Sequence, residues 1–283
     1  MKKRIYLCAI NNVLSGSCNE DCKFCTQSVR YGADIARYTF KPVEQIVDEA
    51  KQARANGAIG YCLVTAGKGL DDKKTDYIAQ AAHAVSQAVP ELLLIACNGT
   101  ADEAQLRHLK AHGIGSYNHN LETSKAYYPS ICTTHTWDER YRTCEAVKSV
   151  GLMLCTGGIF GMGESKQDRA DLIKAIASLE PESIPVNFYH PNPALPIKER
   201  TIDRNEALRI VRQVRQSVGE ERLVMVAGGR ELLFSGFEGA MFEAGANAIV
   251  IGNYLTTRGE APDKDRQTIT QLGYEVARGC DFK

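Results

Sequence analysis

Short apolar runs alternate along this chain with longer segments in which apolar residues recur every three or four positions. The first pattern is typical of buried strands and the second of amphipathic helices. The predicted strands cover residues 5–10, 59–65, 92–98, 116–120, 152–158, 183–189, 223–228 and 248–251. The predicted helices cover residues 43–56, 75–89, 102–111, 138–150, 167–179, 204–218, 237–244 and 263–278.

This alternation predicts an α/β fold, a TIM-type (β/α)8 barrel, because strand and helix follow one another eight times in 283 residues. No linker, charge block or low-complexity stretch divides the chain, so we expect residues 1–283 to form a single domain. In such a barrel the chemistry lies at the carboxyl ends of the strands.

Charge and hydropathy argue against nucleic-acid and membrane partners. Lys plus Arg equals Asp plus Glu at 34 each, so no net charge attracts the chain to nucleic acid or anionic lipid. The apolar segment near the N-terminus is too short for a signal peptide, which predicts a cytoplasmic protein. Ten cysteines without an export signal indicate metal binding rather than disulfides.

Three of these cysteines, Cys18, Cys22 and Cys25, directly follow the first predicted strand with C-x3-C-x2-C spacing. Structural zinc sites and cubane clusters both take four protein ligands as a rule. Three thiolates without a local fourth fit a [4Fe–4S] cluster whose unique iron binds another group. The loop resembles the signature of the radical S-adenosylmethionine (SAM) superfamily. The alternatives are a zinc knuckle lacking one ligand and three unrelated thiols.

Four further cysteines fall in or at the end of predicted strands, namely Cys8, Cys62, Cys97 and Cys155. Because side chains alternate along a strand, Cys62 shares its face with Gly60, and Cys155 shares its face with Met153. The pattern permits all four to point into the barrel. One buried cysteine is usually inert, but four on separate strands indicate a second metal centre. We expect no metal at the other three, which are Cys132, Cys144 and Cys280.

Longer motifs occur along nearly the whole chain. Residues 18–28 read CNEDCKFCTQS, 117–124 read YNHNLETS, 133–140 read TTHTWDER and 155–164 read CTGGIFGMGE. Shorter matches follow at residues 185–187, 227–231 and 244–247. With these motifs the chain resembles the biotin synthase family, and the YNHN run is the most specific of them.

The resemblance implies a radical SAM barrel enzyme, a sulfurtransferase that inserts sulfur between two carbons of dethiobiotin. It implies a [4Fe–4S] cluster on the three-cysteine loop, bound SAM, and an auxiliary iron–sulfur cluster that donates the sulfur. The cofactors do this chemistry, so no side chain is expected to be catalytic. The implied partners are dethiobiotin, a flavodoxin or ferredoxin electron donor, and a second copy in a homodimer.

The resemblance also implies roles for individual residues. The auxiliary-cluster ligands would be Cys62, Cys97 and Cys155. The SAM contacts would be Phe24, Asn120, Glu122, Arg140 and Ile159. The substrate contacts would be Asn120 and Asn187 at the ureido ring, and Thr256 and Thr257 at the carboxylate. Chemically, Glu122 can accept from ribose hydroxyls and Arg140 can pair with the methionyl carboxylate. We interpret the glycines of residues 157–163 as allowing close approach to SAM, because the run lacks phosphate-loop spacing.

One position departs from the family pattern. The usual family has an arginine on the seventh strand as the fourth auxiliary ligand, whereas Met225 stands here. Our hypothesis is that Cys8 supplies this ligand, with thioether ligation by Met225 as the second option. Four thiolates suit a [2Fe–2S] or a [4Fe–4S] centre, so both remain open.

Two rival functions remain. The first is a related radical SAM enzyme, such as the methylornithine-forming mutase or the hydrogenase-maturation enzyme. The strand cysteines and the YNHN run argue against it. The second is a non-catalytic iron–sulfur carrier, which would need exposed ligands rather than cysteines inside a barrel.

Overall fold

The computed structural model describes residues 3–279, and its strands are all parallel. They are β1 (Arg4–Leu14), β2 (Gly60–Thr65), β3 (Leu93–Cys97), β4 (Ile114–Asn118), β5 (Met153–Cys155), β6 (Gly158–Phe160), β7 (Ser183–Phe188), β8 (Leu223–Val226), β9 (Ala248–Ile251) and β10 (Glu275–Val276). The strand order is β1-β2-β3-β4-β5-β7-β8-β9, and β1 also pairs with β9, so the sheet closes into a barrel. This confirms the predicted TIM-type fold.

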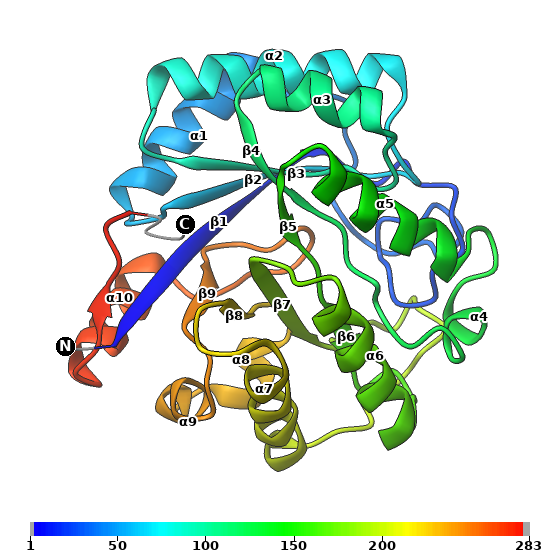
Figure 1. Cartoon of the computed structure of the whole chain (residues 1–283), viewed down its shortest axis with the longest axis vertical. Coiled ribbons are helices and arrows are strands. Elements are labelled where there is room, and N and C mark those ends of the chain that lie inside the picture. The colour runs from blue at the N-terminus through cyan, green and yellow to red at the C-terminus, as the bar shows by residue number, and fades with distance from the viewer. Residues whose placement is uncertain (1–2, 280–283) are drawn as a thin grey trace.

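The helices lie outside the ring of strands (Figure 1). They are α1 (Val43–Ala55), α2 (Asp72–Ala88), α3 (Glu103–Ala111), α4 (Tyr128–Ile131), α5 (Trp137–Ser149), α6 (Lys166–Ser178), α7 (Arg204–Val218), α8 (Arg230–Phe234), α9 (Glu238–Glu243) and α10 (Pro262–Gln271). Within residues 3–279 none of them has the length and apolar character needed to cross a membrane.

The helix starts follow from short polar motifs. α5 and α6 begin with capping boxes, in which Thr136 and Ser165 accept from the backbone of Glu139 and Asp168. The side chains of Glu139 and Asp168 in turn accept from the backbone N–H groups of Thr136 and Ser165. Each box satisfies two backbone donors that the first helical turn leaves unpaired.

Alternation along the strands produces two apolar layers. On β1 the side chain of Leu7 packs outward against the helices, while Cys8 belongs to the cluster inside the barrel. On β2, Leu63 likewise packs outward and Cys62 belongs to the inner cluster. The inner layer therefore contains the sulfur atoms of Cys8 and Cys62, and the outer layer packs between the strands and the helices.

Two predicted elements differ from the structure by more than a shift of their ends. The predicted strand over residues 152–158 is divided into β5 and β6, and both pair with β7. The predicted helix over residues 263–278 ends at Gln271, because Gly273 has φ of +80° and Glu275 then pairs with Arg4 of β1. Glycine adopts this left-handed conformation without strain, so it stops the helix.

Candidate functional site

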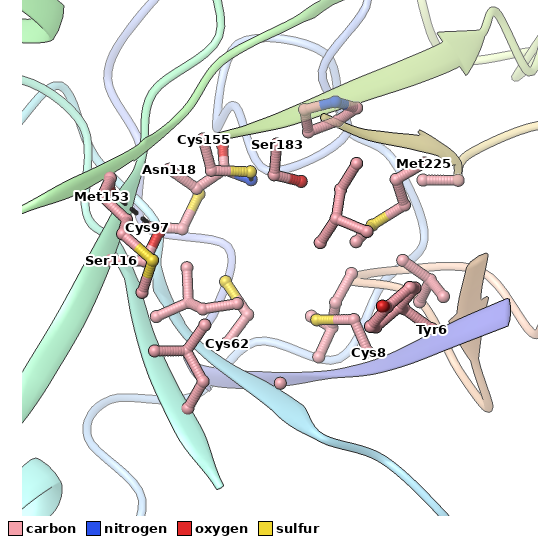
Figure 2. A pocket seen from close by; sticks show the side chains of 18 of the residues that line it. Tyr6, Cys8, Cys62, Cys97, Ser116, Asn118, Met153, Cys155, Ser183 and Met225 are labelled. Carbon is pink, nitrogen blue, oxygen red and sulfur yellow. Dashed lines mark hydrogen bonds between the residues drawn. The ribbon is translucent and has the colours of Figure 1, made fainter. Parts of the chain in front are cut away.

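Sulfur atoms line a cavity of about 190 Å³ inside the barrel. Cys8, Cys62, Cys97 and Cys155 point into it from β1, β2, β3 and β5 (Figure 2). Cys8, Cys62 and Cys155 are each less than a tenth exposed, and Cys97 is intermediate. The inward arrangement that the sequence permitted for these four residues is thus what the structure contains.

The four thiols affect one another electrostatically. The hydrogen bond with Cys97 and burial raise the pKa of Cys62 well above its ordinary value, and Cys8 and Cys155 add to the effect. Burial likewise raises the pKa of Cys155. Several thiolates in such a cavity are unfavourable without a positive charge among them. Iron supplies that charge, so the donor set fits an iron–sulfur cluster.

Two neighbours shape the cavity around Cys8 and Cys155. A Cβ atom on Gly60 would lie 3.2 Å from Cys8 Sγ, so the glycine leaves room for this sulfur. The Nδ2 atom of Asn118 donates to Cys155 Sγ at 3.4 Å. Met225 also lines the cavity from β8, and its sulfur faces inward (Figure 2). Both options for a fourth auxiliary ligand are therefore inside the barrel.

The three-cysteine loop follows β1 and is folded back on itself. Cys18 accepts from Val29 N at 2.9 Å, and the amide of Cys25 donates to Cys22 O at 3.0 Å. Gln27 Oε1 accepts from Gly16 N at 2.5 Å. Burial raises the pKa of Cys25 to about 12, and the negative charge of Cys18 adds to that rise. The thiols of Cys18 and Cys22 are near enough to that of Cys25 to interact with it electrostatically.

Glu122 and Arg140 form a buried ion pair beside this loop, with 3.2 Å between Oε1 and Nη2. Arg140 Nε also donates to Asn120 O at 2.5 Å. Burial raises the pKa of Glu122, and the Arg140 guanidinium counteracts the rise. The second carboxylate oxygen, Oε2, is buried without a protein partner among the described residues. A ribose diol would satisfy it, so the residues fit SAM.

The glycine run after β5 approaches the protein's own backbone. A Cβ on Gly157 would lie 1.9 Å from Pro185 O, and one on Gly158 would lie 2.8 Å from Glu122 O. Ile159 N donates to Glu122 O at 2.8 Å. These glycines therefore bring the segment of Glu122 against β6 and β7.

Phe24 and Ile159 belong to one apolar cluster, although 135 positions separate them. Its buried part includes Tyr128, Met162 and Tyr189. The cluster lies beside Cys22, which is partly buried against it. An apolar surface next to the three-cysteine loop is what a bound adenosyl group needs.

Asn120 and Asn187 both line the sulfur cavity. Asn187 Oδ1 accepts from Gly228 N at 2.9 Å, and its Nδ2 donates to Gly158 O at 3.3 Å. Asn120 Oδ1 accepts from Gly157 N at 3.1 Å. An amide has two acceptor sites and two donor hydrogens, so Asn187 keeps one of each for a ligand.

Thr256 and Thr257 lie between β9 and α10, away from the sulfur cavity's lining. Thr256 Oγ1 is 2.8 Å from Oγ1 of Thr26, the residue that follows Cys25. Thr257 accepts through its carbonyl from Tyr254 N at 3.0 Å. The structure thus connects the predicted carboxylate loop to the three-cysteine loop.

Cys132 and His135 were not among the predicted site residues. Cys132 Sγ lies 3.6 Å from Cys22 Sγ and 3.3 Å from His135 Nδ1. The hydrogen bond with Cys22 lowers the pKa of Cys132 to about 4 and raises the pKa of Cys22. The C-x2-H spacing was the one signal in the sequence. Cys280, also predicted to bind no metal, lies outside the described residues.

Comparison with known proteins places this geometry in a family. Residues 12–176 match the Radical SAM superfamily, and residues 185–275 match the Biotin and Thiamin Synthesis associated domain. The biotin synthase of Sulfurovum sp. is 69% identical over 99% of this chain and 98% of that protein. The biotin synthase of Nitratiruptor sp. is 59% identical over 98% of this chain and 99% of that protein.

The chain belongs to the biotin synthase family. The predicted radical SAM resemblance is thereby confirmed. A crystal structure of methylornithine synthase superposes with a TM-score of 0.82 over 97% of this chain and 84% of that protein. Its 20% sequence identity shows the shared fold alone. The rival reading as a methylornithine-forming enzyme is therefore not favoured over the biotin synthase family.

Proposed function

We propose that this chain inserts sulfur into dethiobiotin to form biotin in a SAM-dependent reaction. The observation that supports this most directly is that two sets of cysteines, those of the barrel cavity and those of the three-cysteine loop, lie near one pair of side-chain amides. Asn120 and Asn187 line the cavity that contains Cys62 and Cys155, and Asn120 also contacts Arg140 near the three-cysteine loop. A substrate bound at these amides would lie between the two metal centres.

The three-cysteine loop would bind the [4Fe–4S] cluster through Cys18, Cys22 and Cys25. Phe24 and Ile159 would cover the adenosyl group, Glu122 Oε2 would accept from a ribose hydroxyl, and Arg140 would offer N–H donors to the methionyl carboxylate. Asn120 would orient both SAM and substrate. When bound and reduced, the cluster and SAM supply a carbon radical that removes hydrogen from unactivated C–H bonds.

The protein's own contribution is positioning and exclusion of water. Asn187 would hold the ureido ring with its remaining donor and acceptor, and Thr256 and Thr257 would bind the carboxylate at the other end. Apolar residues such as Val64 and Ile95 line the same cavity as Asn187. A dry cavity protects a reactive radical from side reactions.

The auxiliary cluster would be bound by Cys62, Cys97 and Cys155, with Cys8 as fourth ligand. Met225 is the second option for that position, because its thioether lines the same cavity. A fourth thiolate in place of an arginine makes the site more negative. Both a [2Fe–2S] and a [4Fe–4S] centre are compatible with four thiolates.

Further parts of the proposal concern partners and organisation. The reaction needs a low-potential electron donor, which we propose to be a flavodoxin or ferredoxin. We also propose one domain over residues 1–283, a homodimer and a cytoplasmic location. Both family matches contribute strands to the same closed barrel, which supports the single domain.

The test uses the anaerobically reconstituted protein with SAM, dethiobiotin and a strong reductant. We expect methionine, 5′-deoxyadenosine and biotin. SAM cleavage without a sulfur-containing product from dethiobiotin would reject the substrate, and intact clusters without SAM cleavage would favour a carrier.

Matched variants separate the two centres. Cys18→Ala should abolish SAM cleavage, whereas Cys62→Ala should keep it and lose sulfur insertion. Cys144→Ala serves as the control, because Cys144 is a fully buried thiol on α5 outside both sets. Equal loss of both activities in all three variants would point to a folding defect and contradict the assignments.

A further inference from the structure

A second set of metal-binding side chains meets the three-cysteine loop. Cys132 and His135 belong to the segment between α4 and α5, and both are less than a tenth exposed. Cys132 Sγ is 3.6 Å from Cys22 Sγ and 3.3 Å from His135 Nδ1. The ligand atoms of Cys22, Cys132 and His135 all lie within 4.8 Å of one another. Glu20 Oε2 is 2.6 Å from His135 Nδ1.

Backbone contacts hold the two segments together. Lys23 N donates to Ile131 O at 2.9 Å. The carboxylate of Asp21 accepts from Thr133 N at 2.9 Å and from Thr134 Oγ1 at 3.0 Å. The segment that contains Cys132 is therefore fixed relative to the loop that contains Glu20 and Cys22. A site fixed in this way loses little entropy when an ion binds.

The spacing of the atoms suits one metal ion rather than a corner of a cubane. With Zn–S of about 2.3 Å, two thiolates on one tetrahedral ion lie about 3.8 Å apart. With Zn–N of about 2.0 Å, a thiolate and an imidazole nitrogen lie about 3.5 Å apart. The observed 3.6 Å and 3.3 Å are close to both values. Terminal thiolates of a cubane bind different irons and do not touch, so Cys132 is poorly placed as its fourth ligand.

Charge is also suitable for a divalent ion. Two thiolates and the Glu20 carboxylate would exceed the charge of a dication by one. Arg140 Nη1 lies 3.3 Å from His135 Nε2 and offsets this excess. Nδ1, the nitrogen nearer to Cys132 Sγ, would exchange its contact with Glu20 Oε2 for the ion. Cysteine, histidine and carboxylate are all common zinc ligands.

We propose that Cys22, Cys132 and His135 form a three-ligand site for one divalent transition-metal ion such as Zn²⁺ in the cluster-free protein, with Glu20 beside His135. The site differs from the sequence-based expectation that Cys132 binds no metal. Cys22 is required by this site and by the [4Fe–4S] cluster, so the ion and the cluster exclude one another. Only the exclusion rests on the proposed function; ion binding does not.

The first experiment titrates cluster-free protein with Co²⁺, which reports tetrahedral thiolate ligation by its visible absorption, and then displaces it with Zn²⁺. The titrations use a Cys62→Ala/Cys97→Ala/Cys155→Ala background, which removes most of the thiols inside the barrel. That protein and the Cys18→Ala/Cys25→Ala double variant made in it should each bind one ion, because both keep Cys22, Cys132 and His135. Cys132→Ala should weaken binding by roughly ten-fold or more. Unchanged affinity in Cys132→Ala, or loss of binding in the double variant, would overturn the site.

Two further variants make the result independent of folding defects. Cys132→Ser keeps the size of the side chain, and His135→Gln keeps a polar group, so each should fold if the alanine variant does not. Both should weaken Co²⁺ binding while the far-ultraviolet circular dichroism stays that of the wild type. Wild-type affinity in both folded variants would refute the proposal.

The exclusion is tested by cluster assembly on zinc-loaded protein in the Cys62→Ala background, where iron reports mainly on the three-cysteine loop. Bound Zn²⁺ should slow formation of the [4Fe–4S] signal several-fold. Adding Cys132→Ala should remove this inhibition. Equal inhibition with and without Cys132 would show that zinc acts elsewhere. If the reconstituted wild type formed no biotin from dethiobiotin, the proposed function would be rejected, and the Co²⁺ result would still stand.

Discussion

Glu122 and Arg140 are paired in the barrel mouth, with Oε1 of the carboxylate 3.2 Å from Nη2 of the guanidinium. Glu122 has φ of +68°, a left-handed conformation that is uncommon for a residue with a side chain. Such strain costs of order 1–3 kcal/mol and persists where surrounding structure fixes it. Here the backbone bonds of Glu122 to Gly157 and Ile159 fix it.

Arg140→Lys should weaken SAM binding by about ten-fold, even though the charge is kept. Arg140 donates to Asn120 O and Glu122 Oε1 from different nitrogens, and a single ammonium cannot make both bonds in this geometry. SAM affinity is measured on the reconstituted protein through the change in the electron paramagnetic resonance spectrum of the reduced cluster. Arg142→Lys, on the same helix, is the control, and equal affinities in the two variants would contradict the role.

Gly157→Ala should prevent folding into the native barrel, because the new Cβ would lie 1.9 Å from Pro185 O. The backbone of β7 cannot move that far without losing its pairing with β6. Gly273→Ala is a comparison in which the new Cβ meets no atom within 4 Å and φ is +80°. That variant should lose only about 1–2 kcal/mol in the free energy of unfolding. Urea denaturation of the soluble fractions measures both, and similar losses would be inconsistent with backbone contact as the cause.

The barrel could be predicted from the sequence because most strands have a continuous apolar run and most helices end at glycine or before proline. The division of one predicted strand at Thr156 could not, since it results from Gly157 and Gly158 packing on distant backbone. Likewise β10 is a two-residue strand whose pairing partner is at the other end of the chain. Local patterns contain no information on such contacts.

The same distinction applies to the site. Strand alternation left two choices for Cys62 and Cys155 and permitted the inward face, which the structure shows. The contact between Cys132 and Cys22 joins residues 110 positions apart in two irregular segments. No periodicity relates such segments, so the structure was needed to bring them together.

Glu139→Gln should lower the free energy of unfolding by roughly 0.5 kcal/mol at neutral pH, because it removes the ion pair with Lys68. The amide oxygen of a glutamine can still complete the capping box of α5. The hydrogen bond from Lys68, at 2.9 Å, lowers the pKa of Glu139 from 4.5 to about 2. The folded state therefore favours the carboxylate, and this contribution is present above about pH 4.5 and lost as the pH falls towards 2.

The difference between wild type and Glu139→Gln should accordingly shrink below pH 4.5, as measured by urea denaturation at several pH values. Glu145→Gln on the exposed face of α5 is the matched control and should differ little from wild type throughout. A Glu139→Gln deficit that is constant down to pH 3 would contradict the electrostatic explanation.

Thr26→Val should raise the KM for dethiobiotin several-fold and leave kcat nearly unchanged. Thr26 Oγ1 is 2.8 Å from Thr256 Oγ1, and the substitution removes the bond that orients the proposed carboxylate loop. A lost hydrogen bond of about 1 kcal/mol corresponds to such a change. Steady-state assays of biotin formation measure it, with Thr270→Val on exposed α10 as the control. An unchanged KM would show that the threonine pair does not position the substrate.

Cys8→Ala and Met225→Leu distinguish the two candidates for the fourth auxiliary ligand, because each removes one sulfur from the cavity wall. In a Cys18→Ala/Cys25→Ala background the bound inorganic sulfide belongs to the auxiliary centre. Cys8→Ala should then lose most iron and sulfide after anaerobic reconstitution. Met225→Leu, which nearly conserves volume, should retain them. Iron and sulfide analysis with Mössbauer spectroscopy measures this, and also the nuclearity of the cluster. The opposite pattern would make Met225 the ligand, and full iron content in both variants would exclude both residues.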